Sequence, residues 1–210
     1  MRLIGIAGQM QSGKDTVADR LKLVFNDLNW NRFAFASPLK QTYCNSFSVD
    51  RDFIEKWKTR TDYPPNMEKT VREGMQFIGD GFRQIMPNIW IMKVFQHIKQ
   101  YEPQDQNFII SDIRYLNEAR AIKDAGGLVM LVWRKDRENN VDHKSEQEVK
   151  PMVDWCRDLK TEGLIDKFEC PLAEKNLFDI FIRNDDDLES LHGKVDTWLV
   201  KYVSQHFNLG

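Results

Sequence analysis

Short apolar runs bounded by polar or turn-forming residues recur along the chain, and this pattern is typical of buried strands. Five runs predict strands, at residues 2–7, 32–36, 108–112, 128–133 and 179–183. The runs are almost continuously hydrophobic, as in parallel strands that are covered on both faces. Because helical segments alternate with them, the pattern predicts an α/β fold with a mainly parallel five-stranded sheet.

Apolar residues spaced three and four positions apart predict three amphipathic helices. The stripes lie within residues 17–28, 71–85 and 188–199. Stripes of this kind are the sides of helices that face a core, so we assign them no cofactor role.

Two stretches are longer than a minimal connection between neighbouring elements. Residues 37–101 have a helical pattern rich in aromatic and basic side chains, and residues 135–176 are highly charged with prolines at 151 and 171. Long insertions at the ends of strands commonly act as lids or cover a substrate. We therefore expect one domain, residues 1–210, with a helical insertion at 37–101 and a lid-like insertion at 135–176.

The composition narrows the function classes. With 41% hydrophobic and 30% charged residues, the chain has an ordinary globular composition, and a net charge of −2 argues against binding nucleic acid over a large surface. No apolar run is long enough to cross a membrane, and residues 1–8 are too short for a signal peptide. The three cysteines and four histidines lack the spacing of a zinc site. We expect a cytoplasmic protein with reduced thiols.

The strongest local signal is a glycine-rich segment between the first predicted strand and the first predicted helix. Gly8 and Gly13 enclose four residues and are followed by Lys14, as in the P-loop of nucleotide-binding proteins. In such a loop, backbone amides and the helix N-terminus bind phosphates, and the lysine reaches the outer phosphates. The pattern predicts an ATP site at Gly8, Gln11, Ser12, Gly13, Lys14, Asp15 and Thr16.

Asp15 departs from the usual P-loop pattern, in which Ser or Thr follows the lysine and contacts Mg²⁺. A carboxylate beside a triphosphate is repelled unless a cation lies between them, so Asp15 and Thr16 are candidate Mg²⁺ ligands. The alternative is that Asp15 only complements the dipole of the helix that begins here.

A second acidic position ends the third predicted strand, where Asp112 follows an apolar run. In P-loop proteins this place serves Mg²⁺ or the attacking group, so Asp112 is a candidate catalytic residue and metal ligand. Arg114 is expected to bind a phosphate through its guanidinium, with a salt bridge to Asp112 as the alternative. Asn117 is expected to cap the next helix and Glu118 to favour its first turn, with contact to substrate as the alternative for both residues.

Several motifs that occur together carry a family resemblance. They are Gly-x4-Gly-Lys-Asp-Thr at residues 8–16, Ser-Asp-Ile-Arg-Tyr-Leu-Asn-Glu-Ala at 111–119 and His-Lys-Ser-Glu at 143–146. Two further segments belong to the same set of motifs, residues 71–79 followed by Trp90, and Ile-Arg-Asn-Asp at 182–185. In this order the motifs resemble the deoxynucleoside monophosphate kinases of tailed bacteriophages, which are P-loop nucleotide kinases.

This resemblance implies a three-layer P-loop NTPase fold in which residues 37–101 bind the acceptor and residues 135–176 form the lid. The implied reaction is the ATP- and Mg²⁺-dependent phosphorylation of deoxynucleoside monophosphates to diphosphates, which supplies phage DNA synthesis in the host cytoplasm. ATP and the monophosphate are then the partners, with no nucleic acid and no membrane. Both a monomer and a homodimer stay open.

The resemblance also implies roles for single residues. Lys14, Asp112 and Arg114 are the implied catalytic residues, while Arg134 and Asn184 join the P-loop as ATP contacts. The implied acceptor contacts are Lys40, Arg72, Gln76, Asp112, Arg114, Glu118 and His143. Two alternatives stay open, an ordinary loop histidine at position 143 and the start of a turn at Asn184.

Other functions of a P-loop protein also stay open. The same scaffold carries other small-molecule kinases, such as dephospho-CoA kinase and phosphomevalonate kinase, and Gly-Lys-Asp-Thr occurs in some of the latter. A nucleotide-gated switch or ATPase would instead hydrolyse ATP without an acceptor. A nucleic-acid binder, using the aromatic and basic residues between positions 30 and 83, would lose affinity steeply with salt.

Overall fold

The computed structural model describes residues 1–209 except for 101–105, 136–146, 160–161 and 165–169. The chain forms two compact units. The sheet unit comprises residues 1–33 and 102–210, and the helical unit comprises residues 34–101. The helical unit is thus inserted into the sheet unit as one continuous segment.

The sheet unit is built on strands in the order β2-β3-β1-β4-β6-β5. Their bounds are β1 Arg2–Ala7, β2 Trp30–Phe33, β3 Asn107–Ile113, β4 Leu128–Trp133, β5 Gly163–Leu164 and β6 Ile180–Arg183. The first five strands of this order pair in parallel, and β5 adds a two-residue antiparallel edge on β6. The predicted five-stranded parallel sheet is confirmed.

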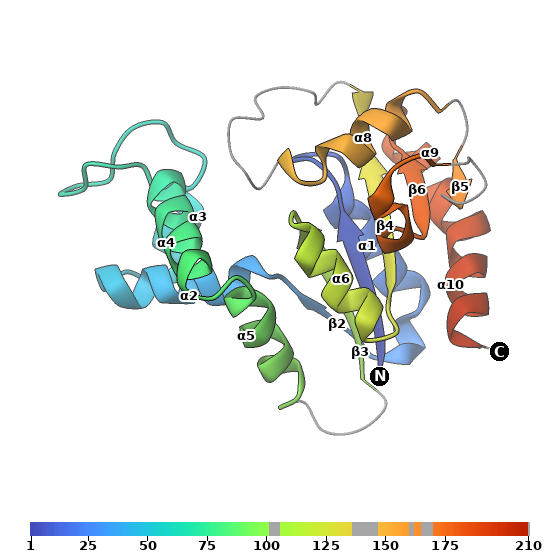
Figure 1. Ribbon diagram of the computed structural model, residues 1–210, viewed down its shortest axis with the longest axis horizontal. Coiled ribbons are helices and arrows are strands. Elements are labelled where there is room, and N and C mark those ends of the chain that lie inside the picture. The colour runs from blue at the N-terminus through green and yellow to red at the C-terminus, as the bar shows by residue number, and fades with distance from the viewer. Residues whose placement is uncertain (101–105, 136–146, 160–161, 165–169, 210) are drawn as a thin grey trace. The chain divides into compact units, whose positions relative to one another are not determined.

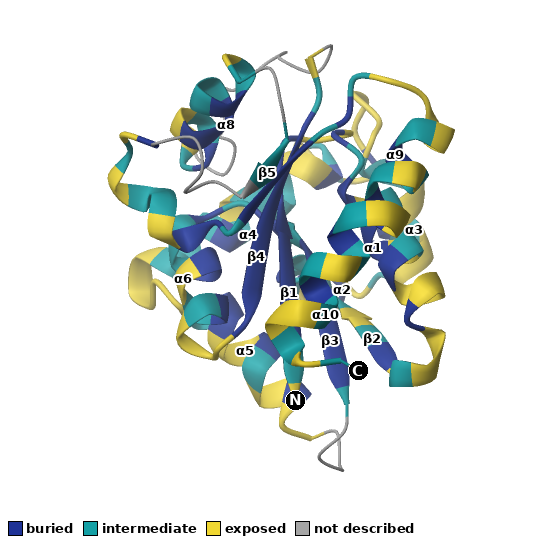
Figure 2. Cartoon of the chain, turned by 90° about the vertical axis from the view of Figure 1, so that its right-hand side faces the viewer, coloured by how far each residue is buried: buried dark blue, intermediate teal, exposed yellow. Residues whose placement is uncertain are grey.

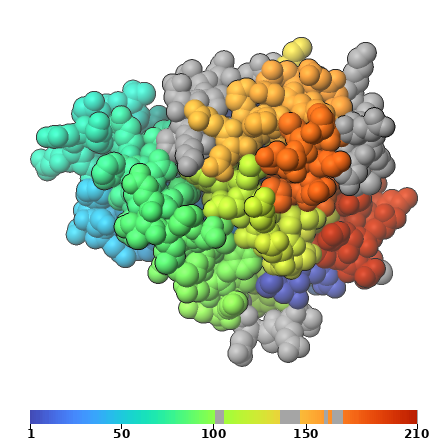
Figure 3. All heavy atoms as spheres, viewed as in Figure 1, coloured from blue at the N-terminus to red at the C-terminus, as the bar shows by residue number. Residues whose placement is uncertain are grey.

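Helices cover both faces of this sheet, which gives the predicted three layers (Figure 1). Helices α1, α9 and α10 lie on one face, and α6 and α8 lie on the other (Figure 2). Their bounds are α1 Lys14–Val24, α6 Leu116–Asp124, α8 Lys150–Arg157, α9 Leu188–Lys194 and α10 Val200–Phe207. Short turns of other helix types lie at Asn26–Leu28, Ala173–Leu177 and Val195–Leu199. In the space-filling view, atoms of α6 (yellow-green) and α8 (orange) lie on the face toward the viewer (Figure 3).

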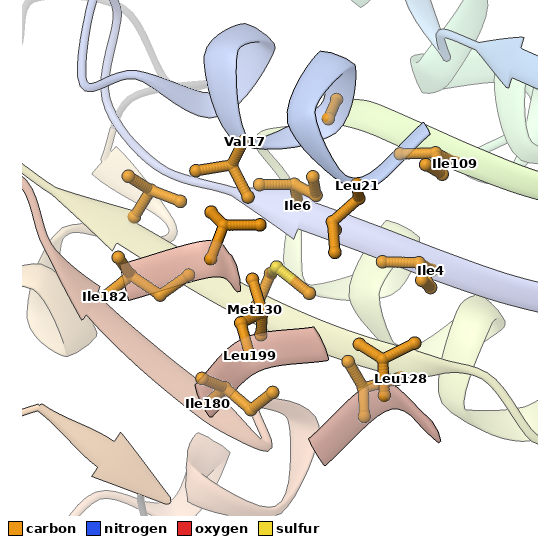
Figure 4. Close-up of a cluster of buried hydrophobic side chains, with 14 of the residues drawn as sticks. Ile4, Ile6, Val17, Leu21, Ile109, Leu128, Met130, Ile180, Ile182 and Leu199 are labelled. Carbon is orange, nitrogen blue, oxygen red and sulfur yellow. The ribbon is translucent and has the colours of Figure 1, made fainter. Parts of the chain in front are cut away.

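The main core lies between the sheet and the layer formed by α1 and the C-terminal helices. Alternate residues of the central strands, such as Ile4 and Ile6, point to this side and meet Val17 and Leu21 of α1 (Figure 4). Gly5 faces the opposite layer, where an added Cβ would lie 2.6 Å from the Ile122 side chain. The glycine therefore lets α6 pack closely on β1.

The helical unit has a small core of its own. It contains α2 Ala36–Phe47, α3 Arg51–Trp57, α4 Val71–Ile85 and α5 Ile89–Ile98. Buried Tyr43, Ile54 and Val71 come from three of these helices and pack together. A capping box begins α4, because the Thr70 hydroxyl accepts the Glu73 amide at 3.2 Å while the Glu73 carboxylate accepts the Thr70 amide at 2.9 Å.

The described part of the predicted lid belongs to the sheet unit. Helix α8 buries Val153 and Cys156 completely, and β5 pairs with β6. The apolar side of this amphipathic helix thus contributes to the core of the sheet unit. Residues 136–146, 160–161 and 165–169 lie outside the described residues, and the lid role of residues 135–176 stays a prediction.

Some element boundaries differ from those expected. The second strand lies at Trp30–Phe33 and not at 32–36, because α2 already begins at Ala36. The predicted C-terminal helix at 188–199 is interrupted by a π-helical turn at Val195–Leu199 and continues to Phe207. Within the described part of the chain, no helix is both long and apolar enough to span a membrane.

Candidate active site

The P-loop connects β1 to α1, and its two framing glycines are required by the backbone. Gly8 has φ +145°, and a Cβ there would lie 2.2 Å from the Val132 carbonyl oxygen of β4. Gly13 has φ +102°, and a Cβ there would lie 2.4 Å from Nδ2 of Asn184. Side chains are disfavoured at positive φ and have no room at either position. The glycine spacing found in the sequence thus follows from the geometry of the loop.

Polar contacts close the loop around Lys14, which is 8% exposed. Its ammonium donates to the Gln9 carbonyl oxygen, and the Ser12 amide donates to the same oxygen at 3.2 Å. The Asn184 side-chain amide donates to the Ser12 carbonyl oxygen at 2.9 Å. Asn184, from the end of β6, therefore supports the loop directly and is more than the start of a turn.

Asp15 belongs to a cluster that the sequence did not indicate. Its carboxylate pairs with the guanidinium of Arg32 from β2 and accepts the Ser111 hydroxyl of β3 at 3.2 Å. The same guanidinium donates to Ser111 at 3.0 and 3.2 Å and to Asp19 at 2.8 Å. The carboxylate beside Lys14 is therefore already compensated by a cation of the protein.

A pocket of about 270 Å³ lies against the first turn of α1. It brings Lys14, Asp15 and Thr16 together with Arg134 and Asn184. Gly8 and Ser12, which were also predicted at the ATP site, do not line this pocket, and the ATP site itself stays a prediction. Four lining residues were not expected, namely Asp186, Asp187, Leu188 and Leu191. The signal for them was a run of acidic residues before an apolar stripe, which is typical of a helix start.

That helix start is α9, whose N-terminus forms one wall of the pocket. The Asp187 carboxylate caps it by accepting the Ser190 amide at 2.8 Å. Nearby, Lys194 of α9 donates to the Arg183 carbonyl oxygen at 2.7 Å and pairs with Glu162 at 2.7 Å and Asp186 at 3.3 Å. These contacts fix the segment after β6 on which the pocket depends.

Asp185 links the ends of β4 and β6 next to this pocket. Its carboxylate accepts the Lys135 amide at 2.8 Å and the Arg183 guanidinium at 2.5 Å. Burial alone would raise the pKa of Asp185, but these donors hold the pKa below its ordinary value. Asp185 is therefore a fixed anion that orders the edge of the site.

Three of the predicted site residues lie around the end of β3. Asp112 and Arg114 are at the strand end, and Glu118 caps the helix that follows. Asp112 is the second-last residue of β3, Arg114 comes directly after the strand, and both are half-buried. The Glu118 carboxylate is buried and accepts the amides of Arg114 at 2.9 Å and Tyr115 at 3.2 Å. This is the structural one of its two predicted roles, and the contact of Glu118 with substrate stays a prediction.

The expected cap at Asn117 is wrong. Helix α6 begins at Leu116, so Asn117 lies inside its first turn. The amides at the helix start are taken instead by Glu118 and by Glu148, whose carboxylate accepts the Leu116 amide at 3.1 Å. Carboxylates at this end also complement the helix dipole.

The predicted acceptor residues Lys40, Arg72 and Gln76 lie in the helical unit. Arg72 and Gln76 are one turn apart on α4, so they share a face of that helix. Lys40 pairs with Glu55 at 2.7 Å, and Lys40 together with Lys58 lowers the pKa of Glu55 to about 2. His143 lies outside the described residues, and its role stays a prediction.

Comparisons with known proteins bear on this site. The family model for deoxynucleotide monophosphate kinase matches residues 54–154. Over 182 residues the chain is 28% identical to "Putative deoxynucleotide monophosphate kinase" of Acanthamoeba polyphaga mimivirus, covering 80% of this chain and 92% of that protein. The predicted family resemblance is confirmed. The chain is therefore similar to a family of nucleotide kinases, which are phosphotransferases.

Two solved structures of kinases are more distant. Shikimate kinase from Aquifex aeolicus is 13% identical with a TM-score of 0.45, covering 99% of both chains. Dephospho-CoA kinase from Campylobacter jejuni is 13% identical with a TM-score of 0.43, covering 96% of this chain and 99% of its own. The fold assignment rests on the strand order and the P-loop geometry described above.

Proposed function

We propose that the protein transfers the γ-phosphate of ATP to a deoxynucleoside monophosphate, giving ADP and the deoxynucleoside diphosphate. The observation that carries this proposal is the pocket in which Lys14 and Thr16 of the P-loop meet Arg134 and Asn184. The family match over residues 54–154 supports a deoxynucleotide as the acceptor.

The P-loop has the chemistry to hold the phosphates of the donor. Its helix N-terminus presents amides and a positive dipole, and Lys14 adds a compact charge. The Ser12 hydroxyl is buried and has no hydrogen-bond partner among the described residues. A buried polar atom of this kind is usually satisfied by a ligand or water, and a phosphate oxygen would satisfy it.

The residues beside the loop also fit Mg²⁺. This ion takes one or two oxygen ligands from the protein and completes its shell with water and substrate phosphates. Thr16 and Asp15 line the pocket and would supply those oxygens, although Arg32 already pairs with the carboxylate. The described residues contain no cluster of three or more acidic, histidine or cysteine side chains suited to a metal. Bound there, Mg²⁺ would neutralise charge on the phosphates.

The transfer itself needs no strong base. A monophosphate has a second pKa of roughly 6, so its attacking oxygen is already ionised near neutral pH. That oxygen forms a bond to the γ-phosphorus as the bond from this phosphorus to the β,γ-bridging oxygen breaks, and ADP leaves with the electron pair. The protein contributes in-line positioning and positive charge from Lys14 and arginines.

For the acceptor, each unit offers residues of suitable chemistry. Arg72 and Gln76 offer a cation and an amide on one face of α4. Arg114 offers a planar guanidinium suited to two parallel bonds with a phosphate. Asp112 would anchor the acceptor or a Mg²⁺-bound water, since the mechanism has no proton for it to remove.

A substrate panel tests the proposal. Purified protein would be given ATP and Mg²⁺ with each of the four common deoxynucleoside monophosphates, the matching ribonucleotides, dephospho-CoA and phosphomevalonate, and ADP release would be measured. We expect turnover with at least one deoxynucleotide, and a loss of on the order of 100-fold or more in kcat for Lys14→Met.

Two results would reject the proposal. ADP release at the same rate without any acceptor would identify an ATPase. Turnover only with dephospho-CoA or phosphomevalonate would place the protein among other small-molecule kinases.

A further inference from the structure

The position directly after the P-loop lysine carries a negative charge in this chain. Asp15 lies in the first turn of α1 and lines the pocket together with Lys14. A carboxylate there would repel the phosphates of a nucleotide. A P-loop with this residue therefore needs a device that removes the repulsion.

The fold places a cation against Asp15 by strand register. Arg32 of β2 pairs with Ile109 of β3, and Ser111 stands two residues further along β3, so Arg32 and Ser111 share one face of the sheet. That face is covered by α1, on which Asp15 and Asp19 are one turn apart. Neighbouring strands and a helix thus bring four polar side chains together.

The contacts within this cluster orient the Asp15 carboxylate. The Arg32 guanidinium and the Ser111 hydroxyl both donate to Oδ1 of Asp15. Ser111 also accepts two bonds from the same guanidinium, at 3.0 and 3.2 Å, which holds Arg32 in place. One carboxylate oxygen is therefore committed to the protein.

This ion pair is too exposed to be a major source of stability. The side chains of Arg32 and Asp15 are 34% and 74% exposed. Exposed pairs contribute little to the free energy of unfolding because water and salt screen them. The pair is therefore expected to affect ligand binding in the pocket that Asp15 lines.

We propose that Arg32, held by Ser111, is a positioning residue of the nucleotide site that neutralises and orients Asp15, so that a P-loop with aspartate after its lysine can accept phosphates. The inference rests on the proposed nucleotide-binding function and deepens it. Arg32 acts through Asp15 and needs no contact of its own with the nucleotide.

A double-mutant cycle on ADP binding tests this inference. Binding is measured by calorimetry in EDTA, so that no metal ion can compensate Asp15. Arg32→Ala leaves the carboxylate uncompensated, and we expect ADP affinity to fall about tenfold. Adding Asp15→Asn to that variant removes the repulsion and should restore most of the affinity.

Two further variants serve as controls. Arg20→Ala removes a guanidinium from α1, the helix that also carries Asp15, where Arg20 pairs with Asp196. This variant should bind ADP as the unmodified protein does. Arg32→Lys keeps the positive charge beside Asp15, so this variant should bind ADP more tightly than Arg32→Ala. It keeps the test decisive even if alanine at position 32 destabilises the fold.

Several outcomes would overturn the inference. If Asp15→Asn fails to restore binding in the Arg32→Ala protein, Arg32 acts on the nucleotide directly or only on folding. Unchanged ADP affinity in Arg32→Ala would show that Asp15 needs no compensation. Normal ADP binding without phosphorylation of any deoxynucleotide would reject the proposed function while leaving this inference intact.

Discussion

Gly13 shows how much of the site depends on a single missing side chain. It stands at φ +102°, and an added Cβ would collide with the Asn184 amide that supports the loop. Left-handed backbone costs a non-glycine residue about 1–3 kcal/mol. We expect Gly13→Ala to lower the free energy of unfolding by more than this strain alone and to abolish ADP binding.

Gly126→Ala is the matched control for that substitution. Gly126 also has positive φ, +75°, but an added Cβ there would have nothing within 4 Å. It should show the backbone strain without a loss of ADP affinity. Urea unfolding and calorimetry on both variants separate the two effects, and equal losses in both would contradict the role of Asn184.

Arg114 tests the assignment of the acceptor site. Lysine keeps the positive charge but cannot form two parallel bonds with a phosphate. Arg114→Lys should raise KM for the deoxynucleotide and lower kcat, with a total loss of about 2–4 kcal/mol in kcat/KM. The KM for ATP should change little. Arg120→Lys on α6 is the control, and a rise in the KM for ATP in Arg114→Lys would move Arg114 to the donor side.

At the scale of single residues, the sequence indicated the phosphate loop but not its charge balance. Gly8, Gly13 and Lys14 form a local motif, so their spacing alone predicted their place. Arg32 and Ser111 meet Asp15 from 17 and 96 positions away, and only strand order brings them there. No local pattern could have paired them.

The strands could be predicted where helices cover both faces of the sheet, because such strands are almost continuously apolar. Strands β1 and β4 coincide with the runs at 2–7 and 128–133 because every side chain there is buried or nearly so. Strand β5 has two residues, too few for any pattern, and depends on its pairing with β6. The π-helical turn at Val195–Leu199 keeps an apolar stripe, so periodicity could not separate it from an α-helix.

Helices α2 and α3 offer a test of pH dependence. Lys40 and Lys58 hold the pKa of Glu55 at about 2, against an ordinary value of 4.5. A lowered pKa means that the stabilisation by Glu55 is complete above pH 4.5 and is lost as the pH falls to about 2. Glu55→Gln should therefore be less stable at pH 7, by about 0–1 kcal/mol since the pairs are exposed.

Thermal unfolding of the two proteins across this range measures the effect. The difference in Tm between Glu55→Gln and the unmodified protein should shrink between pH 4.5 and 2. A difference that persists at pH 2 would show that Glu55 stabilises α3 through packing and not through its charge.

For the whole molecule, the cysteines report on the two units separately. Cys44 is buried in the helical unit, while Cys156 and Cys170 are buried in the sheet unit. Burial also raises the pKa of the Cys156 thiol, which keeps it protonated and unreactive. We expect all three thiols to stay unmodified by a maleimide under native conditions, over a time in which the urea-unfolded chain reacts completely.

Mass spectrometry at intermediate urea concentrations would show the order of opening. Reaction of Cys44 before Cys156 and Cys170 would mean that the helical unit unfolds first, and simultaneous reaction would mean one cooperative transition. Rapid labelling of any cysteine in the native protein would contradict its burial.

The helical unit enters the chain after Phe33 and ends before residue 102, so one uninterrupted stretch of the gene encodes it. The P-loop, its supporting Asn184 and the Arg32 cluster are all encoded outside that stretch. Recombination could therefore replace the insertion in a single event without altering any of these residues. Under the proposed function, such an arrangement would let acceptor preference diversify in a lineage of kinases while the residues proposed to hold the donor are inherited unchanged.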